Sequence, residues 1–223
     1  MNPQDKNPSD AVSREAVLKL RKLELEVAEA ELTTEKARVE LENAKREAEK
    51  ARAKAEESLI YTFYDQVDEE SIKAALAELG KWTRRFPGKE IKIILNSPGG
   101  SVIAGLALYD YILSLRSSGH KVTVVALGMA ASMGGVLLQA GDRRVIGKNA
   151  MLLIHEVSAG AAGKQSEMED QVRFTSRLWD KLAVILAERS KLSARQIKTR
   201  AKRVDWWLSA SEAVKLGFAD EIL

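Results

Sequence analysis

Residues 122–138 read VTVVALGMAASMGGVLL, and this stretch decides how the rest of the chain is interpreted. Val122–Leu127 is an apolar run typical of a buried strand, and Val136–Leu138 is an apolar run that suits a helix. Small residues fill the turn between them, where Ser132 carries the only hydroxyl. Such a turn can expose a nucleophilic serine beside the free N–H groups of a helix start. By itself the pattern fits an ordinary N-cap serine better than a nucleophile.

Composition restricts the class of protein. The chain has 223 residues, 45% hydrophobic and 30% charged, which is enough for one sizeable α/β domain and an appendage. It has no cysteine, which excludes a disulfide framework, a thiolate nucleophile and a cysteine-ligated metal. We expect no metal and no cofactor. The net charge of +3 is too small to indicate nucleic acid. The polar N-terminus and the lack of a long apolar run predict a cytoplasmic protein without signal peptide or membrane contact.

The first part of the chain differs in composition from the rest. Residues 1–12 are polar with two prolines and are predicted to be disordered. Residues 13–58 have neither glycine nor proline, and small or apolar residues recur there at alternating steps of four and three. This heptad pattern predicts a long helix of coiled-coil type. Its members are Ala16, Leu20, Leu23, Val27, Ala30, Thr34, Ala37, Leu41, Ala44, Ala48, Ala51 and Ala55.

A second stripe on this helix recurs every seven residues at Leu18, Leu25, Leu32 and Val39. One interpretation is a solvated spacer helix. The other is an oligomerising or docking helix, which we favour because two apolar stripes on a lone helix would remain in water.

After residue 58, strand and helix patterns alternate. Strands are expected at 59–64, 91–95, 122–127, 144–146 and 151–154, and helices at 68–85, 102–115 and 165–190. The alternation predicts βαβ units and a largely parallel sheet. Residues 157–164 read VSAGAAGK, typical of a substrate-facing loop or an edge strand. Ser209 with Glu212 forms a capping box for a last short helix, which Gly217 ends.

Titratable residues that could do chemistry are few. His120 follows Gly119 in a polar turn, where we expect it to be exposed to solvent. His155 follows the apolar run 151–154, and Asp205 precedes Trp206. Taken singly, each of these residues is more often structural than catalytic.

Taken together, several short motifs in a fixed order resemble the family of Clp protease proteolytic subunits (ClpP), which are serine peptidases. The resemblance covers residues 59–223. It rests on Asn96–Ser101, Gly105, Tyr109–Asp110, Met129–Gly134, Ile154–His155, Asp205, Leu208–Ala210, Glu212–Val214 and Gly217. It implies an α/β fold of the ClpP/crotonase-like type, with repeated β-β-α units and a long handle helix. The chain would then comprise a disordered segment 1–12, a heptad helix 13–58 and a peptidase domain 59–223.

The resemblance also implies site residues. Ser132 would be the nucleophile, His155 the general base and Asp205 the residue that orients the imidazole. The N–H groups of Gly100 and Met133 would form the oxyanion hole. An extended peptide substrate would lie between Ser101, Val102 and Ile103 on one side and a strand containing Val157 and Ser158 on the other.

Partners and alternatives follow from the same resemblance. It implies a homo-oligomer of stacked rings that encloses the sites in a chamber and cleaves protein or peptide substrates. The family's docking to an AAA+ unfoldase is in doubt here, because residues 1–58 bear no likeness to its N-terminal segment. A heptad helix before the peptidase domain is closer to phage-type relatives, some of which mature capsids. A crotonase-like acyl-CoA enzyme and a non-catalytic coiled-coil assembly protein are the alternatives.

Overall fold

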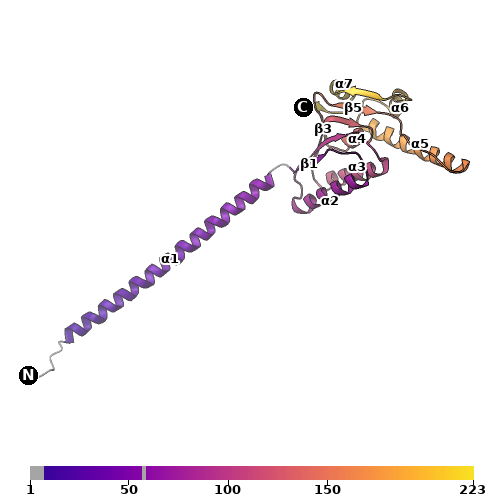
Figure 1. Ribbon diagram of the computed structural model, residues 1–223. Coiled ribbons are helices and arrows are strands. Elements are labelled where there is room, and N and C mark those ends of the chain that lie inside the picture. Colours follow the sequence, from indigo (N-terminus) through magenta and orange to yellow (C-terminus); the bar gives the residue numbers. More distant parts are fainter. Residues whose placement is uncertain (1–7, 57–58) are drawn as a thin grey trace, which may run out of the picture. The chain divides into compact units, whose positions relative to one another are not determined.

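The computed structural model describes the backbone of residues 8–56 and 59–223. The chain divides into two compact units, Met1–Glu57 and Ser58–Leu223, which are coloured along the sequence in Figure 1. In the first unit, α1 (Pro8–Glu56) is one helix of 49 residues. The helix begins at Pro8, five residues before the predicted start at Ser13, and proline is well tolerated in the first turn of a helix. The predicted disorder of residues 1–12 stays a prediction; residues 1–7, and 57–58 at the predicted end of the helix, lie outside the described residues.

The second unit is an α/β domain. Its strands are β1 (Leu59–Phe63), β2 (Ile91–Ser97), β3 (Val122–Ala131), β4 (Arg143–Ile146), β5 (Met151–Ile154), β6 (Trp206–Ser209) and β7 (Glu221–Ile222). Its helices are α2 (Glu69–Arg85), α3 (Val102–Ser117), α4 (Met133–Leu138), α5 (Gln165–Glu188), α6 (Ala194–Arg200) and α7 (Ala210–Leu216). The strand order is β1-β2-β3-β4-β7, and β5 lies between β3 and β6. Only the β5–β6 pair is antiparallel, so the predicted α/β class with a largely parallel sheet is confirmed.

Strand β3 changes its partner halfway along its length. It pairs with β4 over Thr123–Ala126 and with β5 over Met129–Ala131. The change occurs at Gly128, whose φ of 71° glycine adopts without strain. The Asn96 side-chain oxygen accepts the N–H of Met129 at 3.0 Å and holds the bend. Strand β3 therefore runs beyond the predicted end at Leu127, and its last residues are directed toward β5.

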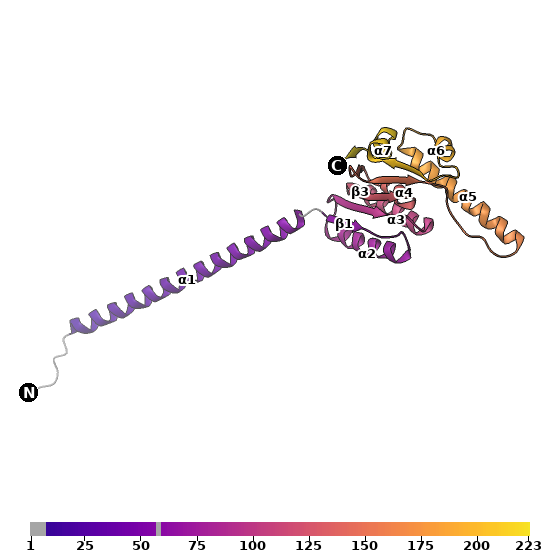
Figure 2. The ribbon, with the colours of Figure 1, turned by 45° about the horizontal axis from the view of Figure 1, so that its top comes forward.

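The helices pack against this sheet through their apolar residues. Helices α2 and α3 lie side by side next to the β1–β3 strands (Figures 1 and 2), and their buried faces supply Leu79, Leu108 and Ile112 to the core. Helix α7 has the predicted Ser209–Glu212 capping box and ends at Gly217 in the left-handed conformation, so this prediction is confirmed.

Helix α5 is buried along only part of its length. Its second half packs into the core through Trp179, Leu182 and Leu186. Its first half is exposed and extends away from the sheet, as Figure 2 shows. The described part of the chain contains no helix long and apolar enough to cross a membrane.

His120 is buried, contrary to the prediction that it faces solvent. Only 3% of its surface is exposed. Its Nδ1 lies 2.8 Å from the carbonyl oxygen of Lys89, in the turn before β2. The long-range contact between two turns, which local polarity does not reveal, explains the error.

Candidate active site

Three adjacent strands bring Ser132, His155 and Asp205 to one edge of the sheet. Ser132 follows β3 and His155 follows β5, and these two strands are parallel neighbours. Asp205 precedes β6, which is antiparallel to β5. The ends of β3 and β5 and the start of β6 therefore meet at the same edge. The sheet topology places the three predicted residues in the order serine, histidine, aspartate.

Ser132 adopts an uncommon backbone conformation. Its φ is 52° and its ψ is −117°, and a residue other than glycine with positive φ costs about 1–3 kcal/mol. Its N–H donates to the carbonyl of Leu153 at 2.9 Å, which ties the turn to β5. Its side chain makes no capping hydrogen bond to α4. The turn therefore leaves the half-buried hydroxyl available for chemistry, unlike that of an ordinary N-cap serine.

His155 and Asp205 are the next residues beyond the end of the β5–β6 ladder, whose last pair is Ile154 with Trp206. His155 is half-buried and Asp205 is exposed. Within residues 59–223, which are fully described, no hydrogen bond joins His155 to Asp205 or to Ser132.

A contact that sequence reasoning missed holds the segment before Asp205. The N–H of Arg203 donates to the carboxylate of Glu156 at 3.0 Å, and Arg203 has a φ of 58°. This bond fixes the turn that precedes Asp205 to the residue after His155. No signal in the sequence links two positions 47 residues apart.

The glycine pair packs directly against the serine turn. A Cβ on Gly99 would lie 2.7 Å from both the Ala131 carbonyl oxygen and the Ser132 Cβ, and one on Gly100 would collide with the carbonyl oxygen of Val67. Their φ values of 90° and 145° also favour glycine. Only glycine fits at these positions.

Val67 holds the glycine pair in place, and sequence reasoning missed it. Its N–H donates to the carbonyl of Gly99 at 2.8 Å, and its carbonyl accepts the N–H of Ser101 at 2.7 Å. Neither Gly100 nor Met133, the predicted oxyanion donors, has a hydrogen-bond partner for its N–H among the described residues. These two N–H groups belong to segments in contact with each other, because Gly99 packs against the amide of Met133.

A cavity of about 560 Å³ opens at this edge of the sheet. Ser132 and His155 line it together with the glycine pair, whereas Asp205 and Met133 do not. All five predicted peptide-binding residues line it as well: Ser101, Val102, Ile103, Val157 and Ser158. Sequence reasoning missed the opposite wall, which α5 supplies through Phe174, Leu178 and Trp179. The helical spacing of these apolar residues was the available signal.

The predicted strand after His155 is absent. Strand β5 ends at Ile154, and residues 155–164, all described, form no strand. Val102 and Ile103 lie in the first turn of α3, because the Ser101 hydroxyl caps that helix by accepting the N–H of Ala104. Glycines at 160 and 163 leave the segment after His155 without a regular partner. The loop interpretation of residues 157–164 therefore fits the structure, and the edge-strand interpretation does not.

Comparison with known proteins places the chain. Residues 42–223 match the family model described as Clp protease, so the match begins within α1 rather than at the predicted residue 59. An ATP-dependent Clp protease proteolytic subunit of Bacteroides fragilis is 37% identical over 160 residues, which cover 71% of this chain and 75% of the relative. A subunit of the same description from Bacteroides thetaiotaomicron is also 37% identical over 160 residues, with 71% of each chain covered.

The family match and these relatives define a class of enzyme: the protein is a serine-type peptidase, and hence a hydrolase. Within that class, the chain belongs to the Clp protease family.

Proposed function

We propose that the chain is an endopeptidase in which Ser132, His155 and Asp205 form the catalytic triad. The observation that carries the proposal is their placement at the ends of the neighbouring strands β3, β5 and β6, beside two N–H groups without partners. Acyl transfer needs a nucleophile, a base and donors for the developing negative charge at one place. This edge of the sheet carries a residue suited to each role.

The reaction would proceed in two halves. In the first, the Ser132 Oγ bonds to the peptide carbonyl carbon while the His155 imidazole takes the hydroxyl proton. The imidazolium then gives this proton to the leaving amine nitrogen as the C–N bond breaks. In the second half, water attacks the acyl ester, its proton passes through His155 to Oγ, and the acid product leaves. Asp205 would orient the imidazole and stabilise its charged form.

The oxyanion would lie between the N–H groups of Gly100 and Met133 during both halves. Both donors are held in place before substrate arrives. Gly100 is fixed because its two neighbours are hydrogen-bonded to Val67, and Met133 is fixed because it is the first residue of α4. Removing one such donor typically costs a factor of 10²–10³ in kcat. Preorganised donors favour the transition state because they need no reorientation as charge develops.

The substrate would be an extended peptide in the 560 Å³ cavity, between residues 101–103 and residues 157–158. Residues 157–158 do not form a strand in the structure, so we infer that they become ordered as a strand when the peptide binds beside them. The same step would shorten the distances within the triad, since catalytic hydrogen bonds are often long before substrate binds. Phe174 and Trp179 offer an apolar wall to one substrate side chain.

Copies of the domain would assemble into a proteolytic chamber. The exposed first half of α5 supports this, because Val172 and Phe174 leave about half of their surfaces in water. The Bacteroides relatives are described as ATP-dependent. For this chain we propose that hydrolysis of short peptides needs no nucleotide, since the chemical steps use only its own residues, and that folded protein substrates need a partner ATPase to unfold them.

Labelling with a fluorophosphonate tests the triad. We expect one adduct, on Ser132, and no adduct in Ser132→Ala. His155→Ala and Asp205→Ala should each slow labelling and peptide hydrolysis by about 10³-fold or more. The variant that carries both substitutions should be only slightly slower than the slower of the two single variants. Unchanged circular dichroism provides the control for folding. Peptide hydrolysis that survives Ser132→Ala would refute the assignment.

A further inference from the structure

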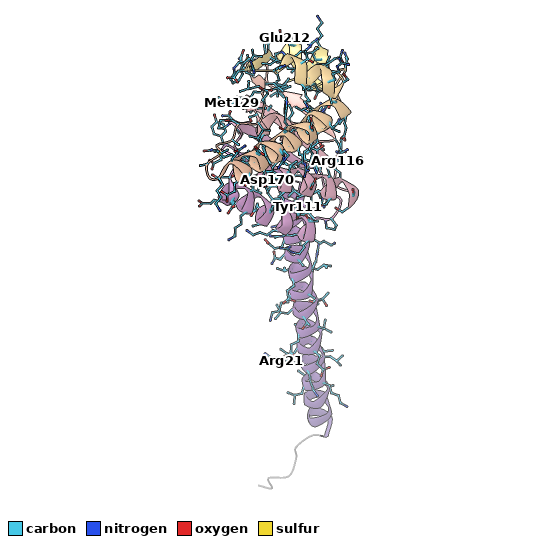
Figure 3. All side chains as sticks on the ribbon, turned by 90° about the vertical axis from the view of Figure 1, so that its right-hand side faces the viewer. Arg21, Tyr111, Arg116, Met129, Asp170 and Glu212 are labelled. Carbon is cyan, nitrogen blue, oxygen red and sulfur yellow. The ribbon has the colours of Figure 1, made fainter. Side chains whose placement is uncertain are left out.

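Helix α1 carries an apolar face with nothing against it in its own unit. Every described side chain of α1, from residue 16 to residue 49, is exposed, and Figure 3 shows them projecting around the helix, Arg21 among them. Leu20, Leu23, Val27 and Leu41 each keep more than half of their surface in water. A face of this length is costly to leave solvated. It therefore requires a partner.

We propose that α1 forms a parallel, in-register coiled coil with α1 of other copies of this chain. This inference concerns the N-terminal unit and does not depend on the proposed peptidase chemistry. The seam would consist of heptad positions a and d. Positions a are Leu20, Val27, Thr34 and Leu41, and positions d are Leu23, Ala30, Ala37 and Ala44.

The one polar residue of this seam fits a coiled-coil core. The hydroxyl of Thr34 donates to the carbonyl of Ala30 at 2.8 Å, within its own helix. Its hydrogen-bonding need is therefore met, and its methyl group can face a partner helix. The alanines on either side allow the helix backbones to approach closely. The seam needs no polar contact from outside.

The flanking charges favour copies of the same helix in parallel. In a parallel pair, a residue at position g faces the residue at position e five positions later on the partner. Lys19 would face Glu24, and Glu40 would face Lys45, which are both attractive pairs. Thr33 facing Arg38 is neutral. One chain thus carries both halves of each attractive pair, and such a surface complements itself.

One pair opposes the arrangement, and the helix itself offsets it. Glu26 would face Glu31, which is repulsive. The ammonium of Lys22 lies 3.9 Å from the Glu26 carboxylate on the same helix and neutralises part of its charge. The balance of the flanking charges remains attractive. A coil shifted by one heptad would leave part of the seam without a partner at each end, so burial of the full seam favours the in-register pair.

The chain offers a matched control for this seam. Leu18 is as exposed as Leu20 but belongs to the second stripe, which points away from positions a and d. The chain contains no cysteine, so a single introduced thiol reports on its own position. Equivalent a-position cysteines in a parallel pair come within the range that a disulfide can bridge. Those on the opposite face do not.

The test is oxidation of the full chain carrying Leu20→Cys or Leu18→Cys, followed by non-reducing electrophoresis. We expect Leu20→Cys to form a disulfide-linked pair at least about tenfold faster than Leu18→Cys. Equal rates, or no cross-link in either variant, would overturn the proposal. Mixing Leu20→Cys with Ala44→Cys tests direction, because an a position packs against a d position when the helices are antiparallel; a preferred mixed pair would mean antiparallel helices and would also overturn it.

Charge exchange tests the register in the Leu20→Cys background. Glu40→Lys should slow cross-linking, and adding Lys45→Glu should restore the rate. A double variant that stays slow would contradict the pairing across the seam. Fluorophosphonate labelling of Ser132 should proceed alike in all of these variants, so that a failure of the coiled coil and a failure of the peptidase assignment give different results.

Discussion

At the scale of single residues, the site depends on how closely Gly99 approaches the serine turn. The backbone of Gly99 passes so near Ser132 and Met133 that no side chain fits between them. This contact sets the position of the Gly100 N–H relative to the nucleophile. A glycine that only serves a turn would leave space for a Cβ atom, as Gly160 does.

Gly99→Ala should therefore destabilise the domain and abolish activity. A methyl group at φ 90°, 2.7 Å from the Ser132 Cβ, forces the serine turn to move. We expect a loss of about 2–4 kcal/mol in the free energy of unfolding, measured by urea denaturation, and no detectable peptide hydrolysis. Gly160→Ala is the matched control and should change stability by less than about 0.5 kcal/mol, because nothing lies within 4 Å of its added Cβ. Equal stability of the two variants would contradict the tight packing.

The residues of the candidate site were predictable to the extent that they lie in short motifs. Ser132, His155 and the glycine pair follow the ends of recognisable strands, and the structure places them around one cavity. The Glu156–Arg203 and Val67–Gly99 contacts were not predictable, because each joins segments far apart in the chain through backbone groups. His120 was assigned wrongly for the same reason: its partner is the distant carbonyl of Lys89.

At the scale of elements, one charged pair fastens the last strand to the sheet. Arg144 of β4 is almost fully buried and donates to the carboxylate of Asp220, just before β7, and to the carbonyl of Gly217 at 2.8 Å. Burial opposes ionisation of the Asp220 carboxyl, but hydrogen bonds and charge from Arg144 outweigh it and hold the pKa of Asp220 below its ordinary value of 3.8. The pair thus links β4, α7 and β7.

Asp220→Asn should lower stability in a pH-dependent way. Because the pKa of Asp220 is lower in the folded state than in the unfolded state, its contribution is full above about pH 4 and is lost as the pH falls through the folded pKa. We expect a loss of about 1–2 kcal/mol at pH 7, limited by the partial exposure of the carboxylate, and a smaller difference from the parent below pH 4. Thermal unfolding at pH 7 and pH 3 checks this.

Asp110→Asn is the control for the Asp220 measurement, since Asp110 is exposed on α3. It should leave the unfolding temperature nearly unchanged at both pH values. A difference between Asp220→Asn and the parent that stays constant from pH 7 to pH 3 would exclude the Arg144–Asp220 pair as its cause.

Most elements follow from periodicity, and the exceptions have local causes. The helix patterns of 68–85 and 102–115 correspond to α2 and α3, since each buries one apolar face. Strand β3 continues past Leu127 because Asn96 supports the bend at Gly128. Strand β6, with its two tryptophans, was not predicted. It forms by antiparallel pairing with β5, and the local sequence pattern does not predict this pairing.

At the scale of the whole molecule, the two units have separate physical grounds for stability. The buried core of the second unit is drawn from Leu59 to Ala219, whereas the described side chains of α1, residues 16–49, are all exposed. Its ladder of strands also begins at Leu59. Helix α1, by contrast, has an apolar face that finds no cover within its own unit. The family match starting at residue 42 nevertheless includes the last part of this helix.

Removing residues 1–57 should therefore leave a folded domain with a different assembly size. The remaining chain keeps the described core from Leu59 to Ala219, so we expect a cooperative thermal transition and continued fluorophosphonate labelling of Ser132. Its mass by light scattering should fall relative to the full chain by more than the deleted residues account for, because contacts through α1 are lost. A second truncation, of residues 1–41, keeps the part of α1 inside the family match and separates the two contributions. If the 1–57 truncation fails to fold while the 1–41 truncation folds, residues 42–57 belong physically to the peptidase domain; if both keep the parent's assembly, α1 does not associate.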